Sequence, residues 1–212
     1  MDVKQEIKRL NFLHVLTIFI YVLIMPLLIL LLYKSDPAAF EIKSKLLNLL
    51  NLTLPVTAIL LPIAFSQDAM EGAGNELLYI GHKIKIKNYL CAVFVSLTLS
   101  SVSFVISHLL FDLSLGFTLG EYARFCIIGA FLVSMYYMIL YISASYMATN
   151  LIVGTYVIVC SYILRRDILV SYYSDKCFDK TLFLRRYLLY LILIPVFFMI
   201  GRYKNRHFEK YS

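Results

Sequence analysis

The sequence predicts an all-α protein that crosses a membrane six times, and composition is the first reason. Hydrophobic residues make up 61% of the 212 residues. The usual count of apolar residues omits Tyr and includes Gly, and by that count the apolar fraction is roughly 57%, against ~45–50% in soluble domains. The mean hydropathy is +0.79, and charged residues, 16% of the chain, gather between long apolar runs. A soluble chain of this length has no core large enough to bury so much apolar surface.

The apolar runs have the length of membrane helices. A spanning helix needs about 20 apolar residues, because a helix satisfies its own backbone polar groups in lipid. The second run contains Asn48, Asn51, Pro55 and Pro62, which predicts a kinked helix that faces other helices or a cavity. The sixth run is the shortest and contains Pro195. The predicted spans, all within one transmembrane domain over 1–212, are 12–33, 46–65, 89–111, 122–143, 146–164 and 187–201.

The connections between these runs are short. Residues 34–45, 112–121 and 143–145 join neighbouring spans, and the last of these predicts a tight hairpin. Residues 165–186 precede the sixth span, and the apolar stretch 168–170 within them predicts an interfacial segment. None of these loops has the length of a soluble domain.

Charge and cysteine usage exclude two further classes. The net charge is +7, but the basic residues flank apolar runs, where they meet lipid headgroups. We therefore expect a lipid bilayer as partner and no nucleic acid. Cys91, Cys126 and Cys160 fall inside apolar runs and Cys177 lies in a polar loop, a distribution that does not predict a disulfide framework.

The positive-inside rule gives no orientation for these spans. With six spans, both termini and the loop between the second and third spans lie on one side, which carries ten Lys and Arg residues. The other side also carries ten. Those on the other side are Lys34, Lys43, Lys45, Arg124, Arg165, Arg166, Lys176, Lys180, Arg185 and Arg186.

Motifs for chemistry are missing from most of the chain. The stretch from Gly74 to Gly81 lacks the lysine of a phosphate-binding loop, so we expect no ATP hydrolysis by this chain and no bound cofactor. The four histidines are far apart in sequence, which predicts no metal site. Ser107, His108 and Asp112 could be imagined as a hydrolase constellation, but adjacent helical residues point about 100° apart. Few ionisable residues fall inside the predicted spans, which argues against a proton-coupled carrier.

One polar island, residues 65–89, separates the second and third apolar runs. Acids stand at its front, lysines at its back and two leucines between them. We predict an amphipathic helix over 66–88 that lies at the membrane surface, with carboxylates near its N-terminus complementing the helix dipole. The lysines would contact headgroups. The residues concerned are Asp68, Glu71, Gly74, Glu76, Leu77 and Leu78, followed by Lys83, Lys85 and Lys87.

This island resembles the loop between the second and third spans in permease subunits of type-2 ATP-binding-cassette (ABC) exporters. That loop carries a pattern near E-x-G-T-x-E-L-L, then a proline and basic residues. Here the order is Glu71-Gly72, Gly74 and Glu76-Leu77-Leu78, with the lysines following. The glycine register differs by one residue, threonine is missing, and Gly81-His82 replace the proline. The six-span layout, the hairpin and the segment before the last span also resemble that family.

The resemblance implies a function. The island would be a coupling helix that contacts a cytoplasmic ATP-binding subunit, which holds ATP and Mg. The chain would pair with a second permease copy or a homologous permease in a bacterial plasma membrane, with both termini cytoplasmic. It would export an amphiphilic substrate such as a peptide, a lipid-linked molecule or an antibiotic.

Other interpretations stay open at this point. The island would also suit an ordinary amphipathic connector that seals the helix bundle. A non-transporting membrane scaffold or immunity protein is the alternative function, and an intramembrane enzyme is the third.

Overall fold

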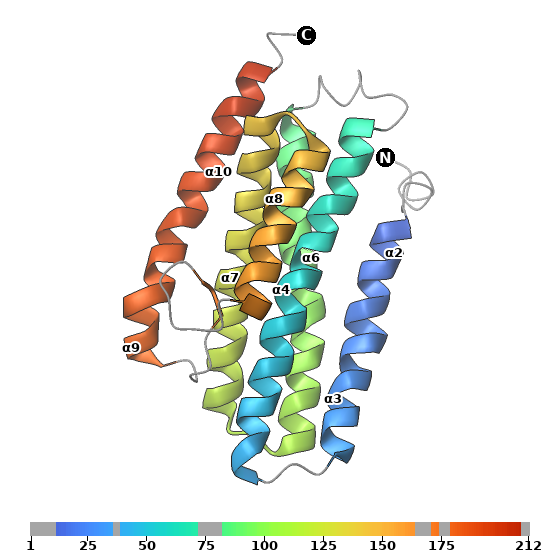
Figure 1. Cartoon of the computed structure of the whole chain (residues 1–212), viewed down its shortest axis with the longest axis vertical. Coiled ribbons are helices and arrows are strands. Elements are labelled where there is room, and N and C mark those ends of the chain that lie inside the picture. Colours follow the sequence, from blue (N-terminus) through green and yellow to red (C-terminus); the bar gives the residue numbers. More distant parts are fainter. Residues whose placement is uncertain (1–11, 36–38, 72–81, 164–170, 174–178, 209–212) are drawn as a thin grey trace.

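The chain forms a bundle of long helices that run along a common direction (Figure 1). The computed structural model describes residues 12–35, 39–71, 82–163, 171–173 and 179–208. Within these residues, six helices are long and apolar enough to cross a membrane, which confirms the all-α, six-span prediction. They are Phe12–Lys34, Glu41–Ser66, Tyr89–Phe111, Leu115–Ser143, Tyr146–Ile163 and Phe183–Asn205.

Three of the six spans contain a π-helical turn. Such a turn inserts one residue into the helix and so rotates the side chains after it relative to those before it. The first span is α2 (Phe12–Phe19), η1 (Ile20–Ile24) and α3 (Met25–Lys34). The fifth is α8 (Tyr146–Ile158) and η2 (Val159–Ile163), and the sixth is α9 (Lys180–Leu182), η3 (Phe183–Tyr187) and α10 (Leu188–Phe208). The second, third and fourth are α4 (Ala39–Glu71), α6 (His82–Phe111) and α7 (Leu115–Ser143).

Helix α7 is the centre of the bundle. Of the spans described, it has the largest share of buried residues, 67%, and α4 follows with 61%. Helix α4 stays helical through Pro55 and Pro62, and its burial agrees with the prediction that it faces other helices. The spans at the periphery present apolar side chains outward, as lipid contact requires.

Helix α10 packs closely on α7 because Gly201 has no side chain. A Cβ atom at Gly201 would lie 2.4 Å from Cδ1 of Tyr137 and 3.2 Å from Cα of Met138. Tyr137 is fixed in turn by ring contacts with Tyr89 and Phe198, at centroid distances of 4.5 and 5.3 Å. The contact between the two helices therefore depends on this glycine.

The connection between α7 and α8 is the predicted tight hairpin. Ala144 ends α7 in the left-handed conformation, with φ of 52°. Ser145 begins α8, and its hydroxyl accepts a hydrogen bond from the Ala148 amide at 3.3 Å. The hairpin thus satisfies both helix ends with local partners.

Two predicted boundaries are corrected. Helix α7 begins at Leu115, so Glu121 lies inside the fourth span and not in the loop 112–121, and Arg124, which the charge count placed on one side of the membrane, is buried within that span. Similarly, η3 begins at Phe183, which places Arg185 and Arg186 inside the sixth span. Both errors have one cause, because charged residues end an apolar run even where the helix continues through them.

The predicted surface helix over 66–88 is also revised at its two ends. Helix α4 continues to Glu71 and α6 begins at His82, so both ends of the island extend the spans. Asp68 and Glu71 lie in α4, while Lys83, Lys85 and the exposed Lys87 lie in α6. Positions outside the described residues are Gly74, Glu76, Leu77, Leu78, Cys177 and the stretch 168–170.

Candidate functional site

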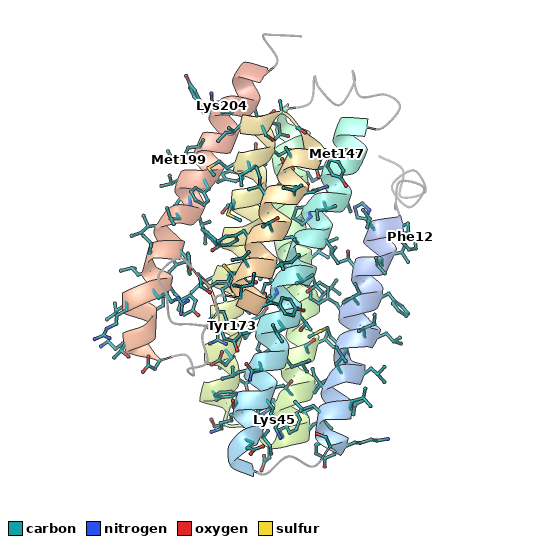
Figure 2. All side chains as sticks on the ribbon, in the orientation of Figure 1. Phe12, Lys45, Met147, Tyr173, Met199 and Lys204 are labelled. Carbon is teal, nitrogen blue, oxygen red and sulfur yellow. The ribbon has the colours of Figure 1, made fainter. Side chains whose placement is uncertain are left out.

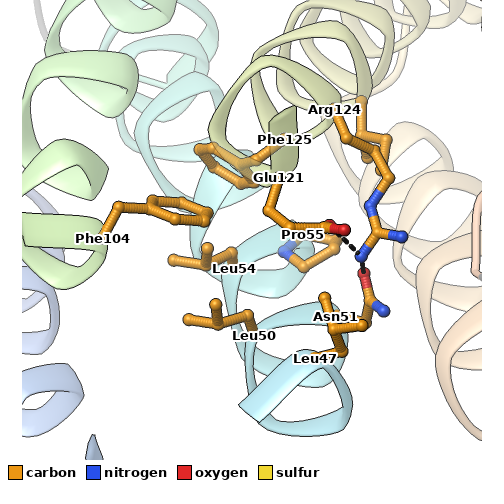
Figure 3. Close-up of a pocket in the computed structure, with 10 residues that line it drawn as sticks. Leu47, Leu50, Asn51, Leu54, Pro55, Phe104, Glu121, Arg124 and Phe125 are labelled. Carbon is orange, nitrogen blue, oxygen red and sulfur yellow. Dashed lines mark hydrogen bonds and ion pairs between the residues drawn. The ribbon is translucent and has the colours of Figure 1, made fainter. Parts of the chain in front are cut away.

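A buried polar cluster joins α4 to α7 within the membrane-spanning region (Figure 3). Arg124 lies three residues after Glu121 on α7, and its Nη2 atom is 2.8 Å from Oε2 of Glu121. The same Nη2 atom donates a hydrogen bond of 2.9 Å to Oδ1 of Asn51 on α4. Both charged side chains are only 3% exposed. Ionised groups at this depth are costly unless paired, and for that reason they mark functional sites.

A small cavity lies beside this cluster. Its volume is about 10 Å³, which is close to the space of one water molecule. Asn51, Glu121 and Arg124 form its polar side, while Phe104 reaches it from α6. The remaining lining residues are Leu47, Leu50, Leu54, Pro55, Phe125 and Ile128. The cavity thus combines one acid, one base and one amide with an apolar wall.

Pro55 weakens α4 next to the cluster. Proline has no amide hydrogen, so it makes no helical hydrogen bond to the carbonyl of Asn51, four residues earlier. Pro55 also lines the cavity itself (Figure 3). The helix therefore lacks one backbone hydrogen bond near its contact with Arg124.

A non-helical segment, Ser171–Tyr173, is buried against the same part of the bundle. The hydroxyl of Tyr173 donates to Oδ1 of Asn48, one helical turn before Asn51 on α4. Figure 2 places Tyr173 along the bundle between Lys45 near one end and Lys204 near the other. Non-helical backbone at membrane depth is tolerated only where protein or a cavity surrounds it.

Tyr172 anchors this segment to the fifth span. Its hydroxyl donates to the carbonyl of Val157 at 3.1 Å and lies 2.5 Å from the Ser161 hydroxyl. The Tyr187 hydroxyl donates to the carbonyl of Tyr172 at 3.2 Å. Burial raises the pKa of the Tyr172 phenol, so the group stays protonated and keeps its hydrogen to donate.

The polar cluster extends from α7 toward the sixth span. The hydroxyl of Tyr187 interacts electrostatically with Arg124, Arg186 and Glu121. Arg186 is buried, although it belongs to η3 near the start of its span. It interacts with the hydroxyl of Tyr190 on α10. One connected group of polar side chains thus links α4, α7 and the sixth span.

A second polar contact lies near the end of α4 that leads into the island. The hydroxyl of Tyr136, which is fully buried on α7, lies 2.7 Å from the Ser66 hydroxyl on α4. It also donates to Oδ1 of Asn150 on α8 at 2.7 Å. Tyr136 therefore connects three spans through one oxygen atom.

The imagined hydrolase constellation is separated. Ser107 donates to the carbonyl of Ser103 at 2.7 Å, within its own helix. Nδ1 of His108 lies 3.5 Å from the hydroxyl of Thr118, and Asp112 is exposed. Each group thus has surroundings of its own, and the structure does not assemble them. Among the described residues, no three His, Cys, Asp or Glu side chains are grouped to hold a metal ion.

The residues of the buried cluster were misplaced by sequence reasoning. The sequence suggested few ionisable residues inside the spans, whereas Glu121 and Arg124 are buried in the fourth and Arg186 in the sixth. The sequence does contain a signal for this buried pair. An acid and a base stand three residues apart beside an apolar run, and that spacing places them on one helix face.

Comparisons of the chain with models of protein families, with curated proteins and with solved structures find no match. No family is identified. The helix lengths and hydropathy indicate a multi-pass membrane protein, and its interior contains a closed site with a charged pair.

Proposed function

We propose that this chain is the membrane-spanning permease subunit of an ABC exporter and works with a separate ATP-binding subunit. The observation that carries the proposal is the continuation of α4 and α6 beyond their apolar spans. Helix α4 extends five residues past Ser66, and α6 begins seven residues before Tyr89. At about 1.5 Å per residue these are projections of about 7 and 10 Å. A subunit that contacts residues 72–81 would push on two spans directly.

The contacts of α4 support the transmission of such a push. The last residue of its span, Ser66, contacts Tyr136, which in turn holds Asn150 on α8. A displacement of α4 at this end therefore acts on α7 and α8 together. Helices transmit displacement well because their backbone hydrogen bonds keep them stiff along the axis.

A revised charge count supports a cytoplasmic location for this end. The start of α2 and the end of α10 lie toward the same end of the bundle as the end of α4 (Figure 1). Arg124 and Arg186 are buried between helices and do not belong to a loop. Their removal leaves eight basic residues on the opposite side, against ten on the side of the termini. The positive-inside rule then favours cytoplasmic termini in a bacterial plasma membrane.

The proposal includes the partners and the substrate class that the resemblance implies. ATP and Mg would bind in the cytoplasmic subunit, and two permease chains, identical or homologous, would form the pathway. The substrate would be amphiphilic, such as a peptide, a lipid-linked molecule or an antibiotic. The chain itself would catalyse no reaction.

One observation favours a second candidate, a non-transporting scaffold or immunity protein. The cavity beside Glu121 and Arg124 holds about one water molecule and no substrate of the proposed kind. A scaffold needs no larger space. For an exporter, the same observation describes the closed state, which must open before the substrate enters.

Co-purification from native membranes in a mild detergent tests the two candidates. We expect a soluble ATPase to elute in equal amount with the chain and to be lost when Glu71 and Glu76 are both replaced by Lys. Glu41→Lys is the matched control, because it reverses an exposed acid at the opposite end of α4, where Glu41 pairs with Lys45 at 2.6 Å. An intact chain that elutes alone or with another integral protein would refute the exporter and favour the scaffold.

A further inference from the structure

We propose that the cavity beside Asn51, Glu121 and Arg124 is a binding site for one structural water molecule that bridges α4 and α7. The site would serve an exporter and a scaffold alike, so it goes beyond the proposed function. The volume of the cavity, about 10 Å³, is close to the space that a single buried water requires. The size admits water, and the polar side of the lining would hold it there.

The polar side chains of the cavity offer the hydrogen bonds that a buried water needs. Asn51, Glu121 and Arg124 converge on one side of it (Figure 3). A carboxylate accepts, a guanidinium donates, and a side-chain amide does both. A water molecule can donate twice and accept twice, and buried waters typically make about three hydrogen bonds. The lining therefore supplies both kinds of partner on one side and an apolar wall on the other.

The backbone of α4 adds a further acceptor at the same place. Proline has no amide hydrogen, so the Asn51 carbonyl receives no α-helical hydrogen bond from Pro55. Both residues line the cavity. Ordered water is one of the groups that satisfy the carbonyls freed by proline in membrane helices. A water bound to Arg124 can donate to this carbonyl and so connect the interrupted turn of α4 to α7.

The charges around the cavity favour a neutral ligand. Glu121, Arg124 and Arg186 are all buried, and the Tyr187 hydroxyl interacts with all three. An ion would add a further charge to this set and would have to lose its hydration to enter, which is costly. Water adds no charge, and it can turn to donate to the acid and to accept from a base. Size and charge thus agree on water.

A water at this position would keep the contact between α4 and α7 satisfied while α4 moves. Arg124 donates directly to Oδ1 of Asn51. If α4 moved away, this buried donor would lose an acceptor, which is unfavourable. The water can enter between the two groups, accept from Arg124 and donate to Asn51. The exchange lengthens the contact by about 2.8 Å, one further hydrogen-bond length.

X-ray radiolytic footprinting of the purified full-length chain in a non-ionic detergent tests this site. A brief pulse converts water into hydroxyl radicals, which oxidise side chains close to where they form, and mass spectrometry locates the products. Phe104 and Phe125 line the cavity and are 5% and 4% exposed. Phe131 is the control, because it is also 4% exposed but packs against Tyr190 and Phe197, outside the cavity lining. We expect Phe104 and Phe125 to be oxidised severalfold faster than Phe131, even with a radical scavenger in the bulk solvent.

Removal of the charged pair should dry the cavity. The double variant E121M/R124M removes both charges together, so neither member of the pair is buried alone. It leaves Asn51 as the polar side chain of the lining. Because apolar cavities stay dry, oxidation of the two lining phenylalanines should fall to the rate of the control phenylalanine. The matched variant E41M/K45M removes an exposed pair on α4 and should leave the native rates unchanged.

A high-resolution density map of the native chain gives a second measurement that needs no variant. We expect a peak in the cavity within hydrogen-bond distance, about 2.7–3.2 Å, of Glu121 and Arg124. The proposal is overturned if the map shows no peak, if the lining phenylalanines are oxidised no faster than Phe131 or only without the scavenger, or if their oxidation persists in E121M/R124M. Neither measurement uses ATP or the ATPase, so loss of the ATPase on co-purification refutes only the exporter.

Discussion

Replacement of Gly201 by Ala should separate α10 from α7 and destabilise the bundle. A Cβ atom there would lie 2.4 and 2.7 Å from two ring carbons of Tyr137. The ring cannot rotate away easily, because Tyr89 and Phe198 pack against it and Asn205 donates to its hydroxyl at 3.4 Å. The Cα atom of Met138, at 3.2 Å, limits any retreat in that direction.

Two opposing effects set the magnitude of this change. Overpacking in a filled core costs roughly 1–3 kcal/mol, while an Ala in place of Gly stabilises a helix interior by up to about 1 kcal/mol. The net cost at Gly201 is then about 0–2 kcal/mol. Gly154 on α8 is the matched control, because nothing lies within 4 Å of a Cβ atom there. Gly154→Ala should stabilise the chain slightly, so the two variants should differ by roughly 2 kcal/mol.

The assay follows from the distribution of cysteines. The chain has no Trp, but Cys160 is in no disulfide, is 1% exposed and should react with a maleimide once the chain unfolds. A fluorogenic maleimide in a heating ramp, on a background with Cys91, Cys126 and Cys177 replaced by Ser, reports this exposure. About 2 kcal/mol corresponds to roughly 4–8 °C for a chain of this size. Equal melting temperatures for the Gly201 and Gly154 variants would refute the close packing of α10 on α7.

Two further predictions concern the Tyr136 hydroxyl and the orientation of the chain in the membrane. Tyr136→Phe removes the hydroxyl that joins α4 to α8, and we expect the free energy of unfolding to fall by about 1 kcal/mol in the same assay. Tyr162→Phe, at an exposed position, is its control. Equal losses in the two variants would argue against a connecting role of Tyr136. A cysteine at Lys45 should react with a membrane-impermeant maleimide in intact cells, whereas one at Lys204 should react only after permeabilisation. Both lysines are exposed near opposite ends of the bundle (Figure 2), and the reverse labelling would overturn the orientation.

The helices of this bundle were largely predictable because the signal is additive over many residues. About 20 apolar residues in a row leave a chain few alternatives in lipid. The hairpin at Ser143–Ser145 was equally readable, since serine at a helix start supplies a local acceptor. These features depend on residues that are neighbours in sequence, and such local patterns can be read from one sequence alone.

The candidate site was not predictable in the same way, because it depends on contacts between distant residues. Asn51 and Arg124 are 73 positions apart, and no local pattern joins them. A charged residue lowers the hydropathy of its window whether it lies in water or is neutralised by a partner inside the bundle. Glu121 and Arg186 were therefore assigned to loops, and Arg124 was counted among the basic residues on one side of the membrane. The non-helical segment at Tyr173 was missed because its burial is set by the helices around it.

The positions of the interhelical bonds of α4 indicate how the bundle changes shape. One end of the helix is held by Asn48 and Asn51, and the other by Ser66, with Pro55 and Pro62 between them. Such bonds are worth about 0.6 kcal/mol each in a membrane protein, so the three together hold α4 by about 2 kcal/mol. At about 1.4 kcal/mol per factor of ten, loss of these bonds alone would reduce an arrangement to a few per cent of the population, and loss of the packing of the buried α4 side chains would reduce it further. A push along α4 would bend the helix at Pro55 or Pro62, where backbone hydrogen bonds are missing, and would be transmitted along the regular helix between them. The closed site and the proposed coupling therefore need no further hinge.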